Sequence, residues 1–268
     1  MPVASEEARE GVVTLHKAGR VGYIAFENPA RKNAVSLEML IDFERIIIDL
    51  VNDKNIRTIV ITGAGGNFVT GADISKFEKV RSTEEGIKHY AETNERVYGL
   101  VLNCPKPTIA MIRGYCVGGG LSLAMACDLR ICSSNARFSL PAAKLGLGYS
   151  PSALKWFVHI LGPAQTKEIF LTARLFNADE AFGMGLVNRT VPDEALDEFV
   201  GEYAELIGGN APLTLESIKV SIAQILRGEA AADSAICQEF VDRCWKSQDY
   251  VEGRRAFIEK RKPVFVGA

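Results

Sequence analysis

The sequence predicts an α/β protein in which a sheet-containing first part is followed by a helical last part. Strand-like runs alternate with loops and helical segments up to residue 150, an order typical of βαβ units with a parallel sheet. The continuous β-branched run at residues 56–62 is typical of a strand that is buried on both faces. From residue 152 onward helical segments dominate, interrupted by one short strand at 187–191.

The first elements follow from local patterns. Residues 12–16 and 21–26 read as two strands of a hairpin, joined by a turn at Gly19-Arg20. Apolar residues recur at helical spacing over residues 37–52, and the Ser36 hydroxyl can cap the start of that helix. A glycine-rich loop at 63–73 follows the buried strand, and we expect a short helix near Ile74 and a polar helix over 83–102. The other expected elements are strands at 108–112, 128–133 and 137–140, a helix at 121–126, a loop at 141–151, and helices at 152–161, 163–173, 178–184, 193–208, 212–227, 233–246 and 248–260.

Composition indicates a globular protein with a sizeable core. The chain has 268 residues, 47% hydrophobic and 24% charged, which suits one large domain or a core with a smaller appendage. A net charge of −2 gives no electrostatic reason to expect nucleic acid or an anionic membrane as partner. The longest apolar runs fall far short of the roughly 18 residues of a membrane span. The N-terminus is acidic and lacks the apolar segment of a secretory signal, so we expect a cytoplasmic protein.

Several common sites are excluded by their spacing. The six cysteines form no C-x-x-C pair and most lie in apolar segments, so we expect buried thiols rather than disulfides. The three histidines show no metal-binding spacing, and we expect no metal site. Gly63-Ala-Gly-Gly after a strand suggests dinucleotide binding, but Phe68 stands where that fingerprint needs Gly or Ala. No P-loop lysine and no G-x-S-x-G elbow is present.

Two glycine-rich segments carry the clearest chemical signal. One is Gly71-Ala72-Asp73, and the other is Gly118-Gly119-Gly120, which opens the small-residue run at 121–126. A helix start leaves backbone N–H groups without intrahelical partners, and glycines let a ligand approach them. If both preceding strands lie in one sheet, two N–H groups converge on one carbonyl oxygen and form an oxyanion hole. The alternative is that the three glycines only let helix and strand pack tightly.

Specific motifs follow one another along nearly the whole chain. They are Asn67-Phe-Val-Thr-Gly-Ala-Asp-Ile74, Gly-Tyr-x-x-Gly-Gly-Gly within 106–128, Arg137-Phe-Ser-Leu-Pro141, Leu161-Gly-Pro with Leu171-Thr-Ala, Ala181-x-x-x-Gly-Leu-Val187 and Glu252-Gly-x-x-Ala-Phe-x-Glu-Lys-Arg261. In this order they resemble the enoyl-CoA hydratase/isomerase (crotonase) superfamily.

The resemblance implies a crotonase-like ββα spiral core over residues 1–200 and a helical trimerisation part over 201–268. It implies homotrimers or dimers of trimers and an acyl-CoA thioester substrate, whose coenzyme A is the only cofactor-like group. The N–H groups of Ala72 and Gly119 would hold the thioester oxygen as an enolate forms. The residues implied to contact coenzyme A are Ala30, Arg31, Lys32, Ala34, Ala72, Asp73, Ile74, Ser75, Phe257 and Lys260.

The chain departs from the family at the acid–base positions. Two glutamates act in the family's hydratases, and the matching positions here are Ser122 and Ala143, while a position used by some dienoyl isomerases is Pro151. A serine needs an activating partner to act as a base, and an alanine cannot act as one. Efficient two-glutamate hydration is therefore not supported by these residues. Isomerisation, thioester hydrolysis, decarboxylation and CoA-ester binding without catalysis stay open.

Other polar groups are expected near the site, and Tyr149 is our candidate proton donor among them. Each of these groups can equally serve a structural role. They are Ser122, Lys144, Tyr149, Ser150 and Ser152, with His89, Tyr90 or Glu92 added if the 83–102 helix covers the pocket.

Overall fold

A six-stranded sheet of order β1-β2-β3-β4-β6-β9 forms the centre of the computed structural model, which describes residues 11–73, 83–228 and 232–268. Its strands are β1 (Val12–Ala18), β2 (Val21–Glu27), β3 (Thr58–Gly63), β4 (Thr108–Ile112), β6 (Leu129–Ser133) and β9 (Arg189–Val191). β1 and β2 form the predicted antiparallel hairpin, and the later neighbours pair in parallel. The predicted α/β class is confirmed, and the parallel strands end at one common edge.

A second, three-stranded sheet of order β5-β7-β8 was only partly foreseen. It consists of β5 (Tyr115–Val117), β7 (Arg137–Ser139) and β8 (Phe176–Asn177). β7 was predicted, whereas β5 and β8 were missed. Strands of three and two residues are too short to show an alternating pattern, so only their pairing with β7 defines them.

The helices agree closely with the predicted ranges. They are α1 (Leu37–Asn52), α3 (Glu84–Leu102), α4 (Gly119–Ala126), α5 (Pro151–Thr172), α6 (Ala178–Gly183), α7 (Leu196–Gly208), α8 (Pro212–Ile225), α9 (Ser234–Trp245) and α10 (Gln248–Glu259), with short 3-10 turns η1 (Pro29–Arg31), η2 (Pro141–Leu145) and η3 (Asp193–Ala195). The Ser36 hydroxyl accepts a hydrogen bond from the Met39 N–H at 3.3 Å, which confirms the predicted cap. α5 is interrupted at Gly162, whose φ is 72°, just where two separate helices were expected. The short helix expected near Ile74 lies outside the described residues.

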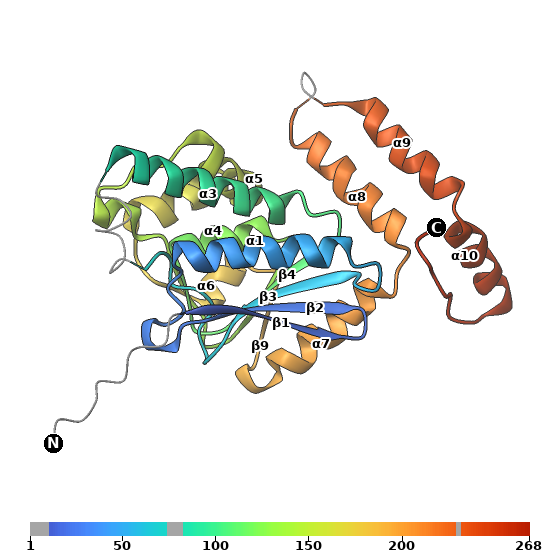
Figure 1. Ribbon diagram of the computed structural model, residues 1–268, viewed down its shortest axis with the longest axis horizontal. Coiled ribbons are helices and arrows are strands. Elements are labelled where there is room, and N and C mark those ends of the chain that lie inside the picture. Colours follow the sequence, from blue (N-terminus) through green and yellow to red (C-terminus); the bar gives the residue numbers. More distant parts are fainter. Residues whose placement is uncertain (1–10, 74–82, 229–231) are drawn as a thin grey trace.

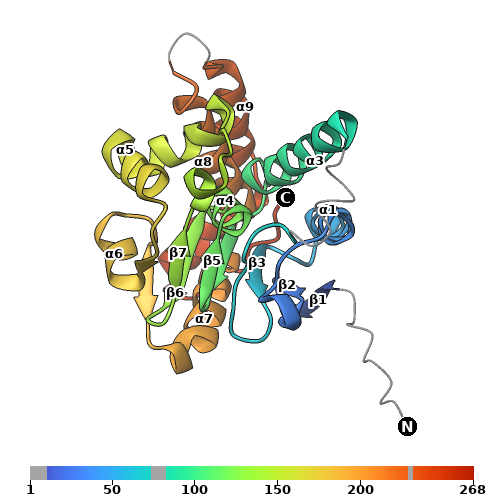
Figure 2. The ribbon, with the colours of Figure 1, turned by 90° about the vertical axis from the view of Figure 1, so that its left-hand side faces the viewer.

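Helices cover both faces of the large sheet (Figure 1). Ile59 and Ile61 of β3 pack into the core shared with α1, α3 and α4, whereas Val60 packs into the core under α7. This confirms that the β-branched run is a strand buried on both faces. In Figure 2, α4 lies at the end of β5, between the small sheet and α3. α4 therefore starts where the parallel strands end.

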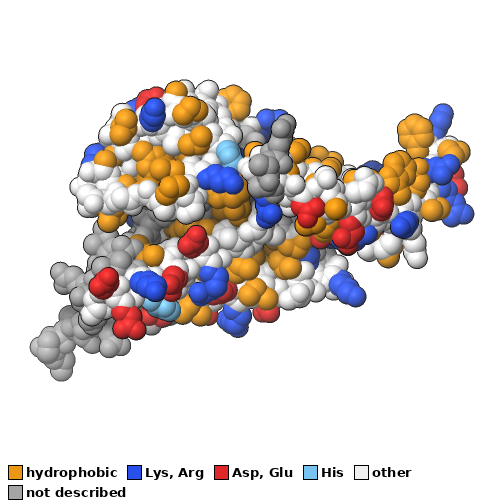
Figure 3. All heavy atoms as spheres, turned by 90° about the horizontal axis from the view of Figure 1, so that it is seen from above, with side chains coloured by type: hydrophobic (Ala, Val, Ile, Leu, Met, Phe, Trp, Pro, Cys, Tyr) orange, Lys and Arg blue, Asp and Glu red, His pale blue; other side chains and the backbone are white. Residues whose placement is uncertain are grey.

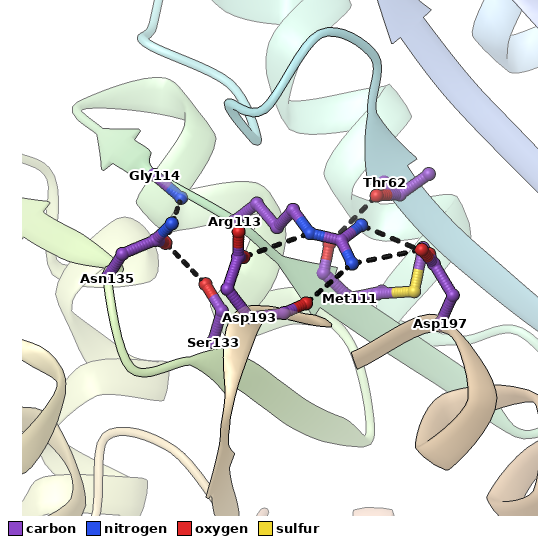
Figure 4. Close-up of polar contacts among 8 residues, drawn as sticks. All are labelled: Thr62, Met111, Arg113, Gly114, Ser133, Asn135, Asp193 and Asp197. Atoms are coloured by element: carbon purple, nitrogen blue, oxygen red, sulfur yellow. Dashed lines mark hydrogen bonds and ion pairs between the residues drawn. The ribbon is translucent and has the colours of Figure 1, made fainter. Parts of the chain in front are cut away.

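Arg113 fastens α7 to the carboxyl end of β4 (Figure 4). Its guanidinium donates to both carboxylate oxygens of Asp197, at 3.1 and 2.9 Å. It also donates to Asp193 Oδ1 at 3.1 Å and to the Asp193 carbonyl at 2.9 Å. The planar fork of arginine suits such a two-pronged contact. The ion pairs hold the start of α7 against the end of β4.

The last three helices form an arm that projects from the core (Figure 1). We call residues 212–268 the C-terminal arm. Lys219 of α8 donates to Asp128 Oδ2 at 2.5 Å and to the Lys106 carbonyl at 3.0 Å. Arg57 donates to the Phe265 carbonyl at 2.8 Å. Within the described ranges, no helix is both long enough and apolar enough to cross a bilayer.

Candidate functional site

The two glycine-rich segments lie in contact with each other. A Cβ atom placed on Gly71 would lie 3.5 Å from the Gly119 nitrogen and 3.3 Å from the Val117 carbonyl oxygen. A short parallel bridge between Val69 and Cys116, with the Val117 N–H donating to the Val69 carbonyl at 2.9 Å, holds the segments side by side. The structure thus brings together the two segments predicted to converge.

The Ala72 N–H points away from Val35, the residue with which Ala72 forms an isolated parallel bridge. Its neighbours bond to Val35: the Val35 N–H donates to the Gly71 carbonyl at 2.8 Å, and the Asp73 N–H donates to the Val35 carbonyl at 2.9 Å. Successive N–H groups of an extended chain point to opposite sides, so the Ala72 N–H points away from Val35. Ala72 lines a cavity, and among the described residues no group accepts from its N–H.

The Gly119 N–H is the second available donor. Gly119 is the first residue of α4, where an N–H has no intrahelical acceptor. The preceding Gly118 has a φ of 57°, and its own N–H donates to the Ser139 carbonyl at 2.9 Å. A Cβ atom on Gly120 would lie 2.0 Å from the Val69 carbonyl oxygen, so no side chain fits there. The glycine run therefore serves both predicted purposes: Gly119 offers a donor, and Gly120 permits tight packing.

Both donors face one cavity of about 540 Å³ between α3, α4, the η2 segment and α5. Ser122, one turn after Gly119, lies in its wall together with Tyr149. Burial raises the pKa of Tyr149, and the polar side chain of Ser122 acts on this pKa in the opposite direction. The Tyr149 ring packs edge-on against Phe170, with 4.9 Å between ring centroids. The structure thus places Ser122, where the resemblance implies a glutamate, in the same cavity wall as Tyr149, the candidate proton donor.

Other predicted residues divide between the wall and the surface. Ser150 and Ser152 are wall residues whose hydroxyls lie 2.8 Å apart, and Ser150 also caps α5, which is a structural role. Tyr90 is in the wall as well. The exposed Ala143 is not among the described wall residues; its neighbour Ala142 takes that place. The exposed side chains of Lys144, His89 and Glu92 also lie outside that wall, and Pro151, the first residue of α5, is exposed.

Tyr98 is a site residue that the sequence did not reveal. Its hydroxyl donates to the Gly119 carbonyl at 3.1 Å, which links α3 to the first turn of α4. Burial raises the pKa of Tyr98 well above its usual value, so its phenol stays a hydrogen-bond donor. Asn94 and Glu95 of α3 also line the cavity and were missed. A tyrosine within a polar helical stretch gives no sequence signal; its role depends on the helix against which α3 packs.

Several of the predicted coenzyme A residues lie in the basic loop at residues 28–34. In the basic loop, Arg31 pairs with the buried Asp73 at 3.0 Å, and Lys32 Nζ lies 4.5 Å from the centroid of the Tyr115 ring. Asn33 Nδ2 donates to the Ala64 and Asn67 carbonyls at 2.7 and 2.8 Å. This loop, which includes Ala30 and Ala34, is therefore held against the 63–73 loop.

Phe257 and Lys260 lie in the C-terminal arm, away from this loop. Ile74 and Ser75 lie outside the described residues. Phe257 lines a second cavity of about 530 Å³ within the C-terminal arm, and Lys260 ends α10.

Comparisons with known proteins agree with this geometry. Residues 16–268 match the model of the enoyl-CoA hydratase/isomerase family. A short-chain-enoyl-CoA hydratase of Clostridium acetobutylicum is 34% identical over 93% of this chain and 95% of its own. A peroxisomal Delta(3,5)-Delta(2,4)-dienoyl-CoA isomerase of Arabidopsis thaliana is 32% identical over 95% of each chain.

A solved structure shows the same fold. The structure of an enoyl-CoA hydratase/carnithine racemase from Magnetospirillum magneticum superposes with a TM-score of 0.89, at 35% identity over 96% of each chain. With the two glycine segments placed as the motifs predicted, this chain belongs to the enoyl-CoA hydratase/isomerase family and has its crotonase fold.

Proposed function

We propose that this enzyme acts on an acyl-CoA thioester through an enolate whose oxygen is held by the N–H groups of Ala72 and Gly119. The observation that carries the proposal is that these two donors face one cavity and lack acceptors among the described residues. Preorganised backbone donors stabilise the negative charge that develops on a thioester oxygen when the α-carbon loses a substituent. The family and the relatives named above support a CoA thioester as the substrate.

Direct hydration by a pair of glutamates is not part of the proposal. Ser122 and Ala143 occupy the two positions, and the only carboxylate in the described wall is that of the exposed Glu95. We assign proton donation to Tyr149, supported by its place beside Ser122 in the lining of the cavity that also holds Gly119, and by the burial that raises its pKa. The second candidate is decarboxylation, favoured by the replacement of both glutamates, because loss of CO₂ leaves an enolate without any base. Isomerisation, thioester hydrolysis and binding without turnover are outcomes that a substrate screen distinguishes.

The oxyanion hole is tested by a pair of variants at one residue. Proline at the first position of a helix is tolerated but has no N–H, so Gly119→Pro deletes the donor. Gly119→Ala keeps the donor and brings the same Cβ atom to 2.9 Å from the Tyr98 hydroxyl oxygen, so it controls for crowding. We expect Gly119→Pro to be about 10²–10³-fold slower than Gly119→Ala in exchanging the α-protons of butyryl-CoA with deuterium oxide. Equal rates in both variants would show that the Gly119 N–H does not stabilise an enolate.

The acid–base assignment predicts weak hydration. Because neither glutamate position holds a carboxylate, we expect the pure protein to hydrate crotonyl-CoA at less than about one tenth of the rate of a family hydratase that has both. The measurement is the loss of enoyl-thioester absorbance, with a two-glutamate hydratase assayed beside it. Rates within a factor of about ten of each other would refute the prediction. Parallel assays of β,γ-unsaturated and malonyl-type thioesters identify isomerisation or decarboxylation.

We also propose that the working unit is a homotrimer or a dimer of trimers. Two observations support it. The C-terminal arm exposes apolar side chains along its helices (Figure 3), among them Ile218, Ile222 and Ile225 of α8. Phe257 is 85% exposed and lies in the arm rather than beside the oxyanion hole of its own chain, so a neighbouring subunit's hole is the site it would serve.

A further inference from the structure

One face of α4 lines the cavity from the proposed oxyanion hole to the end of the helix. Ser122, Met125 and Ala126 follow Gly119 by three, six and seven residues, and all four residues line the cavity. Residues with this spacing lie on one side of a helix. The wall is therefore polar at the hole, carries one hydroxyl a turn later, and is apolar beyond it.

Other elements also contribute apolar residues to the wall of this cavity. Leu102 comes from α3, Leu145 from η2, Leu147 from the loop that follows η2, and Phe157 from α5. Leu145 and Leu147 are 56% and 48% exposed, which leaves apolar surface open to a ligand. No lysine, arginine or histidine occurs among the described residues of the cavity wall.

We infer that the end of this cavity beside Met125 and Ala126 is an acyl chamber for an uncharged straight chain of about eight carbons. The inference rests on the proposed function, since it places the thioester carbonyl at the oxyanion hole. Met125 lies six residues beyond Gly119, which is about 9 Å along the helix axis. With bonds of about 1.52 Å and angles of about 111°, an extended carbon chain advances about 1.25 Å per carbon. About seven carbons beyond the carbonyl carbon therefore reach Met125 and Ala126.

The chamber predicts how affinity depends on chain length. Burying one methylene group in an apolar wall improves binding about fourfold. Affinity should rise at this rate up to about eight carbons and then level off at the end of the chamber. A carboxylate at the far end of the acyl chain would lose its water without gaining a cation from the described wall, so it should bind poorly.

Equilibrium binding of saturated acyl-CoA thioesters tests this, because a saturated chain cannot be hydrated during the measurement. The series runs from two to twelve carbons, with free coenzyme A as reference and suberyl-CoA as an eight-carbon chain that ends in a carboxylate. We expect butyryl-CoA to bind about 250-fold more weakly than octanoyl-CoA, which corresponds to about fourfold for each of four methylene groups. We expect suberyl-CoA to bind at least about 10-fold more weakly than octanoyl-CoA. Ala126→Leu, which fills the end of the chamber, should move the optimum to shorter chains, and Met125→Ala should move it to longer ones.

The outcomes separate this inference from the function on which it depends. Ala18→Leu adds the same bulk at the exposed end of β1 and should leave the optimum where it is in the unchanged protein. Affinity that does not depend on chain length, or suberyl-CoA binding as tightly as octanoyl-CoA, would overturn the acyl chamber alone. Failure of every acyl-CoA to bind more tightly than free coenzyme A would overturn the proposed function and the chamber together. If a chamber variant does not fold, the chain-length series measured with the unchanged protein still tests whether the acyl chamber exists.

Discussion

At the scale of single residues, the site is made mainly from backbone. In the proposed oxyanion hole, Ala72 and Gly119 contribute only their N–H groups, so Ala72 matters only through its small side chain. In the proposed site, Ser122 and Tyr149 offer two hydroxyls where the resemblance implies a carboxylate. Hydroxyls can donate a proton but cannot act as strong bases near neutral pH. Tyr98 donates a hydrogen bond to the Gly119 carbonyl and so helps to fix the first turn of α4, and we regard it as a positioning residue.

The role of Tyr149 is testable by removing its hydroxyl. Burial raises the pKa of Tyr149 above its usual value of 10.0, so the neutral, proton-donating form persists above pH 10. We expect Tyr149→Phe to lower kcat about 100-fold or more while changing KM little, since the ring stays in place. The unchanged protein should lose activity on the alkaline side only above pH 10, and this loss should be absent from the residual activity of the variant.

The control for this prediction is Tyr203→Phe. Tyr203 lies on α7, where its ring stacks on Phe199 away from the described cavity wall. Removal of this hydroxyl should leave kcat unchanged. If Tyr149→Phe and Tyr203→Phe retain equal activity, the proton comes from another group.

At the scale of elements, the site depends on how helices are fixed to the ends of parallel strands. α4 starts at the end of β5, and α7 is tied by Arg113 to the end of β4. Both helices also pack apolar side chains into the core, such as Leu123 of α4 and Val200 of α7. These attachments keep the loops after the strands in one place, and these loops hold the two N–H groups of the proposed oxyanion hole.

The attachment of α7 predicts a measurable effect on stability. Arg113→Lys keeps the charge but loses the two-pronged contact with Asp197. We expect the free energy of unfolding to fall by about 1–2 kcal/mol, at the low end for charged hydrogen bonds because Asp197 is largely exposed. The measurement is the urea midpoint at constant slope. Arg45→Lys, at an exposed pair with Asp42 at 3.4 Å, is the control and should change the free energy by less than about 0.5 kcal/mol.

At the scale of the whole molecule, the core and the C-terminal arm are built differently. The core buries residues on both faces of its sheet. The contacts described between the arm and the core are the Lys219–Asp128 ion pair and single hydrogen bonds such as that from Arg57 to the Phe265 carbonyl. The arm leaves apolar side chains such as Ile222 and Phe257 exposed. Such a surface is typical of one that becomes buried between subunits.

The assembly is tested by light scattering. We expect the protein to have three or six times the mass of one chain. Ile222→Glu places a charge on the exposed face of α8 and should shift the mass toward that of a single chain. Ile48→Glu, on the exposed side of α1 in the core, is the matched control and should keep the larger mass. A single-chain mass for the unchanged protein, or equal masses for both variants, would contradict the proposal.

The order of the elements was largely predictable from the sequence because it depends on local patterns. The run Ile59-Val-Ile needs burial on two faces wherever it lies, and Ser36 caps α1 through a hydrogen bond that spans three residues. The three glycines at 118–120 likewise predicted that another part of the backbone approaches them closely, as Val69 does at Gly120. Motif order along the chain was enough to predict the crotonase fold.

Only the tertiary structure decided which groups meet at the site. Three features of the site depend on segments that are far apart in sequence. They are the contact between Tyr98 and Gly119, the shared cavity wall of Ser122 and Tyr149, and the position of Ala143 outside the described wall. The strands β5 and β8 were also missed, since two or three residues acquire a strand conformation only from their partners. Sequence patterns determine what each segment does with its own neighbours, because those interactions span a few residues. The direction of a hydroxyl or an N–H toward a cavity depends on packing between distant segments, and packing is settled only when the whole chain is folded.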